Sequence, residues 1–247
     1  MGGALLFLHG LLGSSENWHT LANVFAKTQS VVVPDLRNHG RSPHDTKHDY
    51  PSMVEDIVEL LDSIAIERCT IVGHSMGGKV AMRFALDNPE RVTGMVIEDM
   101  VPGSTFPRYL QFIEALRRID LYEVSSRRNA DSLLAKEIDE VSLRQFLLKN
   151  LERGESGYRW RPNLEVLASS YDSLWRGLDQ SGAYSGPALF IRGGESDTVS
   201  GPRVESIRQY FPLARIETIA GAGHWVHATF QEDFTRMLES FLAWDNR

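Results

Sequence analysis

The sequence predicts an α/β fold with a doubly wound, mostly parallel sheet. Six short apolar runs, each bounded by turn residues, predict buried strands. In chain order these runs are ALLFLHG, SVVVPD, CTIVGH, GMVIED, PALFIRGG and ARIETIAG. Apolar residues at helical spacing follow the second and third runs, over residues 53–64 and 76–86. Strands that alternate with helices pair in parallel through right-handed crossovers, so the pattern predicts one sheet covered by helices.

The alternation stops between residues 104 and 183. Helical patterns such as YLQFIEALRRI and SLRQFLLKNL take over there, with apolar residues three and four positions apart. A helical insert between two strands of such a sheet lies at the carboxyl ends of the strands, where ligands bind. We therefore expect one core made of residues 1–103 and 184–247, with residues 104–183 as a helical cap insert over the site.

Composition restricts the partners and the compartment. The formal net charge of −7 provides no general attraction to a phosphate backbone, so we expect no nucleic-acid partner. No apolar run reaches the roughly 20 residues that span a bilayer, so we expect no membrane span. The single cysteine, Cys69, excludes an intramolecular disulfide and favours a reducing cytoplasm. An organelle such as the mitochondrion stays open, because a removed targeting segment leaves no trace.

The segment GHSMG, residues 73–77, matches the pattern G-x-S-x-G. It directly follows the predicted strand CTIVGH and precedes a predicted helix, which is the context that this pattern requires. The sharp turn presents the Ser75 hydroxyl at a helix N-terminus, and glycines at both ends of the segment let the backbone pass closely. Ser75 is therefore the candidate nucleophile.

A second glycine-containing loop, HGLLG at residues 9–13, ends the first predicted strand. Acyl transfer passes through a tetrahedral oxyanion, and each backbone N–H fixed at its position contributes roughly 3–4 kcal/mol in the transition state. The N–H groups of Leu11 and Met76 are the candidate oxyanion donors. His9 is expected to shape this loop by hydrogen bonding rather than to act as a base.

The loop GAGHW, residues 221–225, follows the last predicted strand and precedes the final helix. A general base must reach hydrogen-bond distance of the nucleophile and titrate near neutrality, and histidine meets both demands. We predict that His224 is the base. His227, three residues further on, is expected to be structural.

Four motifs together resemble the alpha/beta-hydrolase superfamily, and within it a branch of small acyl esterases found in bacteria, with mitochondrial relatives. The motifs are LHGLLGSSENW, DLRNHGRSPH, GHSMGGK and AGAGHWVHA. The resemblance implies hydrolysis of a small-molecule acyl ester or thioester through a Ser-His-Asp triad and an acyl-enzyme, with no metal and no dissociable cofactor. Members usually carry two further strands before the first glycine loop. Only eight residues precede His9, so we expect the sheet to lack those two strands, either because the protein has lost them or because the chain is truncated at this end.

Two aspartates compete for the position of the triad acid. In the superfamily at large the acid follows the strand that corresponds to PALFIRGG, where this chain has Asp197. In the similar esterases it follows the preceding strand in a D-x-x-P pattern, which this chain has as Asp99 to Pro102. We favour Asp99 and keep Asp197 as the alternative. Glu98 is adjacent on an alternating strand, so we expect its side chain to point away from His224.

Other functions remain open from the sequence. The same triad supports carbon–carbon bond hydrolysis, perhydrolysis and lyase steps, and neither fold nor triad separates these reactions. A non-catalytic binding protein that has kept the fold is a further alternative, which the presence of Ser75, His224 and two candidate acids disfavours. His44 and His48 are four residues apart, but Pro43 breaks the helical pattern that a metal pair would need.

Overall fold

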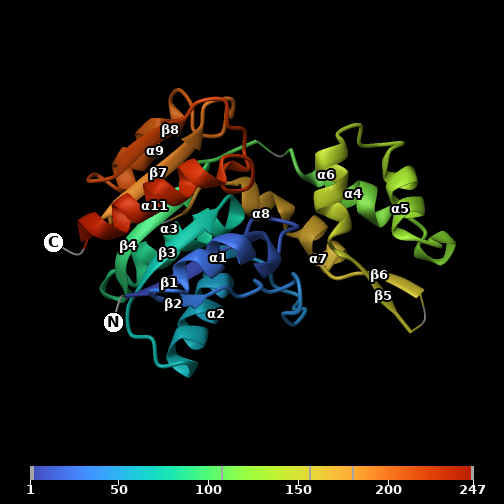
Figure 1. The fold of residues 1–247 in the computed structure, drawn as a ribbon, viewed down its shortest axis with the longest axis horizontal. Coiled ribbons are helices and arrows are strands. Elements are labelled where there is room, and N and C mark those ends of the chain that lie inside the picture. Colours follow the sequence, from blue (N-terminus) through green and yellow to red (C-terminus); the bar gives the residue numbers. More distant parts are fainter. Residues whose placement is uncertain (1–2, 107, 156, 180, 246–247) are drawn as a thin grey trace.

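A six-stranded sheet forms the centre of the computed structural model, which describes residues 3–106, 108–155, 157–179 and 181–245 (Figure 1). The strand order is β2-β1-β3-β4-β7-β8, and every pair of neighbours is parallel. Its strands are β1 (Ala4–Leu8), β2 (Ser30–Val32), β3 (Cys69–His74), β4 (Val92–Glu98), β7 (Ala188–Gly193) and β8 (Arg215–Ile219). The predicted doubly wound parallel sheet is confirmed.

Eleven helices are present among the described residues. They are α1 (His19–Phe25), α2 (Tyr50–Ser63), α3 (Met76–Asp87), α4 (Leu110–Arg117), α5 (Arg127–Leu134), α6 (Val141–Leu148), α7 (Leu164–Ser169), α8 (Tyr171–Trp175), α9 (Arg203–Tyr210), α10 (Val226–Thr229) and α11 (Gln231–Asp245). Short 3-10 turns occur at Ser15–Trp18, Pro89–Arg91 and Leu121–Glu123. Local chemistry sets some of these bounds. The Asp49 carboxylate accepts a hydrogen bond from Ser52 N, which caps the first turn of α2.

Successive residues of the strands point to opposite faces of the sheet and enter two separate cores. From β1, Leu6 and Leu8 pack with residues of α2, α3 and α9 on one face. Leu5 and Phe7 pack with residues of α1 and α11 on the other face. Both cores are apolar and fully buried at these positions, which is why the strands read as nearly continuous apolar runs.

The order of the strands reverses between β1 and β3. The chain leaves β1 through α1 toward β2, and leaves β3 through α3 toward β4 on the other side. The two helices lie on opposite faces, so their loops separate and leave a crevice beyond the carboxyl ends of β1 and β3. The loop that follows β1 begins at His9, and the turn that follows β3 contains Ser75. Topology therefore brings these two loops together.

The segment between β4 and β7 contains α4 to α8 and has an apolar core of its own. Figure 1 shows α4, α5 and α6 grouped to one side of the central sheet. The expectation of a purely helical insert was wrong in one respect, because β5 (Leu151–Gly154) and β6 (Gly157–Trp160) form an antiparallel hairpin. The two strands are only four residues long, too short for alternation to be recognised against the surrounding helices. The division into a core and a cap at residues 104–183 stays a prediction.

The longest described helix, α11, has 15 residues. None of the helices in the described part of the chain is both long enough and apolar enough to cross a membrane. The predicted cytoplasmic location stays a prediction.

Candidate active site

Ser75 occupies a strained turn between β3 and α3. Its backbone has φ 52° and ψ −117°, a left-handed conformation that a residue with a side chain rarely adopts. Neighbouring glycines make the turn possible. A Cβ atom at Gly77 would lie 2.4 Å from the Leu8 carbonyl oxygen, and one at Gly73 would lie 2.4 Å from the Gly77 carbonyl oxygen. The turn therefore packs directly against the end of β1.

The loop after β1 is held by histidines that bind its backbone. His9 Nδ1 donates to the Gly10 carbonyl, and His9 Nε2 accepts from Leu36 N at 3.0 Å. Burial lowers the pKa of His9 and outweighs the opposing effects of its hydrogen bond to Gly10 and of the nearby Asp35 carboxylate, so the ring stays neutral near pH 7. His9 thus shapes the loop, as the sequence indicated. Leu11, a candidate oxyanion donor, lies in this loop.

The side chain of His224 contacts Asp99. Their atoms Nδ1 and Oδ2 lie 2.6 Å apart, and Asp99 is fully buried just beyond the end of β4. Two further donors bind this carboxylate, Ser196 Oγ at 2.5 Å and Gly193 N at 3.2 Å. His224 Nε2, on the far side of the ring, is buried and has no hydrogen-bond partner among the described residues. The contact with Asp99 leaves Nε2 available to exchange a proton.

Asp197 has a different partner. Its carboxylate forms a bidentate ion pair with the Arg108 guanidinium, with Nη1 2.7 Å from Oδ1. Hydrogen bonds from Arg108 hold the pKa of Asp197 below its ordinary value, and half of its side chain is exposed to solvent. The structure therefore brings Asp99 to His224 and Asp197 to the segment that leads into α4.

One cavity joins the predicted site residues. It has a volume of about 200 Å³, and Ser75, His224, Leu11 and Met76 all line it. Apolar and aromatic side chains supply much of the remaining wall, namely Tyr50, Met100, Tyr109, Tyr171, Leu174 and Trp175. Four of these six belong to residues 104–183. Residues 104–183 therefore contribute directly to the wall of the cavity that contains Ser75.

Two features of the site escaped the sequence analysis. Ser196 donates a hydrogen bond to Asp99. This contact was missed because a serine in a glycine-containing loop carries no distinctive sequence signal. Lys79, in the motif GHSMGGK, is fully buried and donates to the carbonyls at the end of α8, including that of Arg176 at 2.5 Å. A lysine on the buried face of a predicted helix was the available signal for this contact, because buried lysines need partners.

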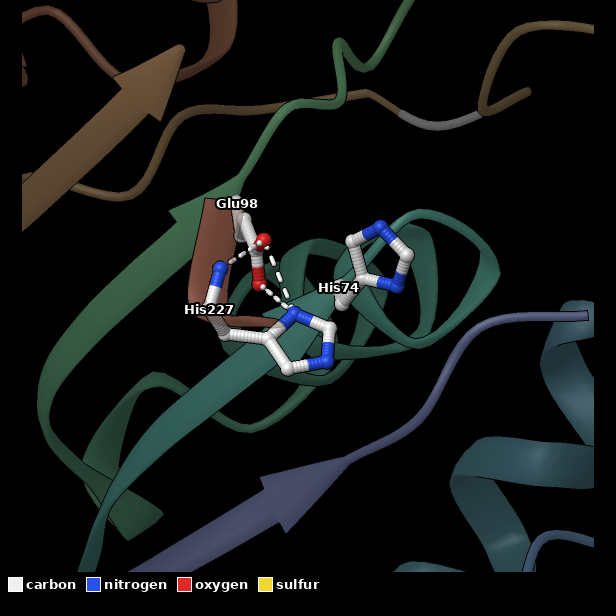
Figure 2. A group of neighbouring side chains, drawn as sticks. All are labelled: His74, Glu98 and His227. Carbon is white, nitrogen blue, oxygen red and sulfur yellow. Dashed lines mark hydrogen bonds and ion pairs between the residues drawn. The ribbon is translucent and has the colours of Figure 1, made fainter. Parts of the chain in front are cut away.

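A further group of buried side chains lies beside the site. Ligand atoms of His74, Glu98 and His227 lie within 4.8 Å of one another, a spacing that a metal ion could use (Figure 2). These atoms already bind protein groups, however. His227 Nδ1 donates to the Glu98 carboxylate, and His74 Nε2 donates to the His224 carbonyl. These hydrogen bonds favour a polar network over a cation site.

The sequence matches the family described as alpha/beta hydrolase fold over residues 3–230. The chain belongs to this family. The matched range includes the HGLLG loop, the Ser75 turn and the His224 loop, and with them every residue that lines the cavity.

Several relatives of this alpha/beta hydrolase are named as esterases or lipases. The sn-1-specific diacylglycerol lipase ABHD11 of Mus musculus is 40% identical over 97% of this chain and 81% of its own length. Esterase YbfF of Escherichia coli is 35% identical over 96% of this chain and 92% of its own. The solved structure of a marine microorganism esterase is 38% identical, with a TM-score of 0.95 over 98% of this chain and 95% of that one. This alpha/beta hydrolase is an esterase-type enzyme, as the motifs indicated.

Proposed function

We propose that this enzyme cleaves carboxylic esters or acyl thioesters through a covalent acyl-enzyme, with Ser75 as nucleophile, His224 as base and Asp99 as acid. The contact between Asp99 Oδ2 and His224 Nδ1 carries the proposal. It sets the tautomer in which Nε2 lacks a proton and can accept one. Ser75 lines the same cavity as His224, on a turn whose strain is typical of an exposed nucleophile.

The reaction proceeds in two halves. His224 Nε2 removes the hydroxyl proton as Ser75 Oγ attacks the carbonyl carbon, and the resulting oxyanion accepts hydrogen bonds from the N–H groups of Leu11 and Met76. The bond to the leaving oxygen or sulfur then breaks, and His224 returns the proton to that atom. In the second half, water attacks the acyl-enzyme with His224 again as base, which releases the carboxylic acid and restores Ser75.

Asp99 stabilises the imidazolium that forms in each half. Its carboxylate is fully buried, where an opposite charge at 2.6 Å acts strongly. The donors from Ser196 and Gly193 hold the carboxylate in place and favour its ionised form. Both carboxylate oxygens of Asp197 accept hydrogen bonds from Arg108, whereas His224 binds Asp99. This arrangement supports Asp99 as the acid.

The wall of the cavity points to a hydrophobic acyl group as the preferred substrate part. Met100, Leu174 and Trp175 present apolar surface to the cavity that contains Ser75, and burial of a hydrocarbon chain against such surface contributes about 0.8 kcal/mol per methylene group. A relative named as a diacylglycerol lipase supports glycerolipid esters as one class of substrate to test.

Substitution of the nucleophile tests this function. Ser75→Ala should fold normally and lose at least about a thousandfold in kcat on p-nitrophenyl esters of graded chain length and on acyl thioesters, because only binding and oxyanion stabilisation remain. A fluorophosphonate probe should label the wild-type enzyme at Ser75 and leave the variant unlabelled. Wild-type labelling at another residue, or a variant with near-normal kcat, would disprove the assignment.

A further inference from the structure

Two adjacent carboxylates at the end of β4 bind two histidines that are three residues apart. Asp99 binds His224, and Glu98 binds His227 at the start of α10. In the second pair the Nδ1–H of His227 is shared between the two Glu98 oxygens, which lie 2.9 Å and 2.8 Å from Nδ1. Glu98 Oε1 also accepts from His227 N at 2.8 Å. The carboxyl end of β4 therefore binds both His224, the proposed base, and α10, the helix that follows His224.

His74 holds the same loop from β3. Its Nε2 donates to the His224 carbonyl at 3.0 Å, so the residue directly before Ser75 binds the backbone of the base. The His74 ring also packs between the two other imidazoles, with centroids 4.7 Å from His224 and 5.0 Å from His227. Figure 2 shows the rings of His74 and His227 side by side, with Glu98 above His227.

The environment of this network determines its charges. Burial alone would raise the pKa of Glu98, but the interaction with His227 and the hydrogen bonds from its side chain and backbone outweigh it and lower that pKa. Burial lowers the pKa of His74 to about 3, so its ring is neutral at physiological pH and places no charge against His224. The Trp18 ring stacks on that of His227, with centroids 4.4 Å apart.

We propose that Glu98, His227 and His74 form a positioning network that sets the location of His224 for the esterase reaction. This inference rests on the proposed role of His224 as base. The network binds the loop on both sides of the imidazole, through the carbonyl of His224 and through the N–H and side chain of His227. A shift of about 1 Å in a catalytic group can cost on the order of a hundredfold in rate, so these contacts act on kcat.

The chemistry of each variant predicts how much kcat should fall. Glu98→Gln keeps the size of the side chain but removes the charge and one acceptor, and should lower kcat about 10- to 100-fold with little change in KM. His227→Leu should lose at least as much. His227→Asn places an amide N–H near the position of Nδ1 and should recover part of the loss.

A matched control separates positioning from general destabilisation. Thr70 lies at the opposite end of β3 from His74, and its hydroxyl binds that of Thr93 at 2.9 Å. Thr70→Val should lower stability without changing kcat. Normal kcat in folded His227→Leu, or equal losses of kcat in Thr70→Val and Glu98→Gln, would overturn the proposal.

A measurement that does not depend on turnover completes the test. The low-field proton resonance of His224 Nδ1–H, assigned by its loss in Asp99→Asn, should shift or broaden in His227→Leu and stay unchanged in Thr70→Val. This readout stands even if the wild-type enzyme fails to hydrolyse esters, a result that would reject the proposed function alone. Activity that is lost on dialysis against EDTA and restored by Zn²⁺ would instead make the cluster a metal site and overturn the positioning role.

Discussion

Lys79 Nζ lies 2.5 Å from the carbonyl oxygen of Arg176, which ties the helix that follows Ser75 to the end of α8. The carbonyls of Leu174 and Trp175 also lie within hydrogen-bond reach of this amine. Both of those residues line the cavity that contains Ser75. The contact therefore links the wall of the cavity to the helix that follows Ser75.

The titration of Lys79 should appear in the stability of the protein. Burial lowers its pKa to about 7. Between pH 7 and about 10.5 the unfolded lysine binds a proton that the folded lysine has lost, so the free energy of unfolding rises with pH in this window. The cost of burying the charge is fully present below pH 7. Lys79→Met should remove a slope of up to about 1.4 kcal/mol per pH unit, measured by urea unfolding from pH 7 to 9.

Lys136→Met provides the control for that experiment. Lys136 is exposed, so the substitution removes the same charge without removing a buried group. A plot of its free energy of unfolding against pH should run parallel to that of the wild type. If the free energy of unfolding of Lys79→Met also ran parallel to that of the wild type, Lys79 would keep its proton throughout the range from pH 7 to 9.

The two aspartates should differ sharply in their effect on turnover. Asp99→Asn should lower kcat by roughly 10⁴, because the imidazolium of His224 loses its partner and the tautomer is no longer fixed. Asp197→Asn should change kcat only a few-fold, since it weakens a half-exposed pair with Arg108. Steady-state kinetics on one ester decides between them. The reverse order of effects would return the acid role to Asp197.

The close packing of the Ser75 turn predicts that Gly77 tolerates no side chain. In Gly77→Ala the new methyl group would meet the backbone of Leu8 and His9, which cannot move without displacing β1. We expect a loss of about 1–3 kcal/mol in the free energy of unfolding, together with a loss of activity. Gly3→Ala, where nothing lies within 4 Å of the new atom, should be neutral. Wild-type stability of Gly77→Ala in urea unfolding would contradict the packing described here.

The preferred acyl length should depend on Trp175. Its side chain lines the cavity that contains Ser75, so Trp175→Ala should enlarge that cavity. The ratio of kcat/KM for long-chain to short-chain esters is expected to rise. Trp160→Ala removes a tryptophan of the hairpin, which does not line this cavity, and should leave the ratio unchanged. An equal ratio in both variants would place the acyl group elsewhere.

The sequence by itself determined the sheet, the Ser75 turn and the loop that contains His224. Each is encoded within about ten consecutive residues, by an apolar run, a glycine spacing or a helical period. The run CTIVGHSMG, residues 69–77, specifies a buried strand, a sharp turn and the start of a helix wherever the segment packs. The hairpin at residues 151–160 escaped because its strands are too short to carry such a period.

Only the tertiary structure decided which charged groups meet. Asp99 and Asp197 both follow strands of the same sheet, and the D-x-x-P pattern favoured Asp99 without excluding Asp197. Arg108 binds Asp197 and leaves Asp99 to His224, while Glu98 turns to His227 and Lys79 reaches the end of α8. These contacts join residues far apart in the chain. They depend on how the loops at the carboxyl edge of the sheet pack against one another, which no local pattern of residues specifies.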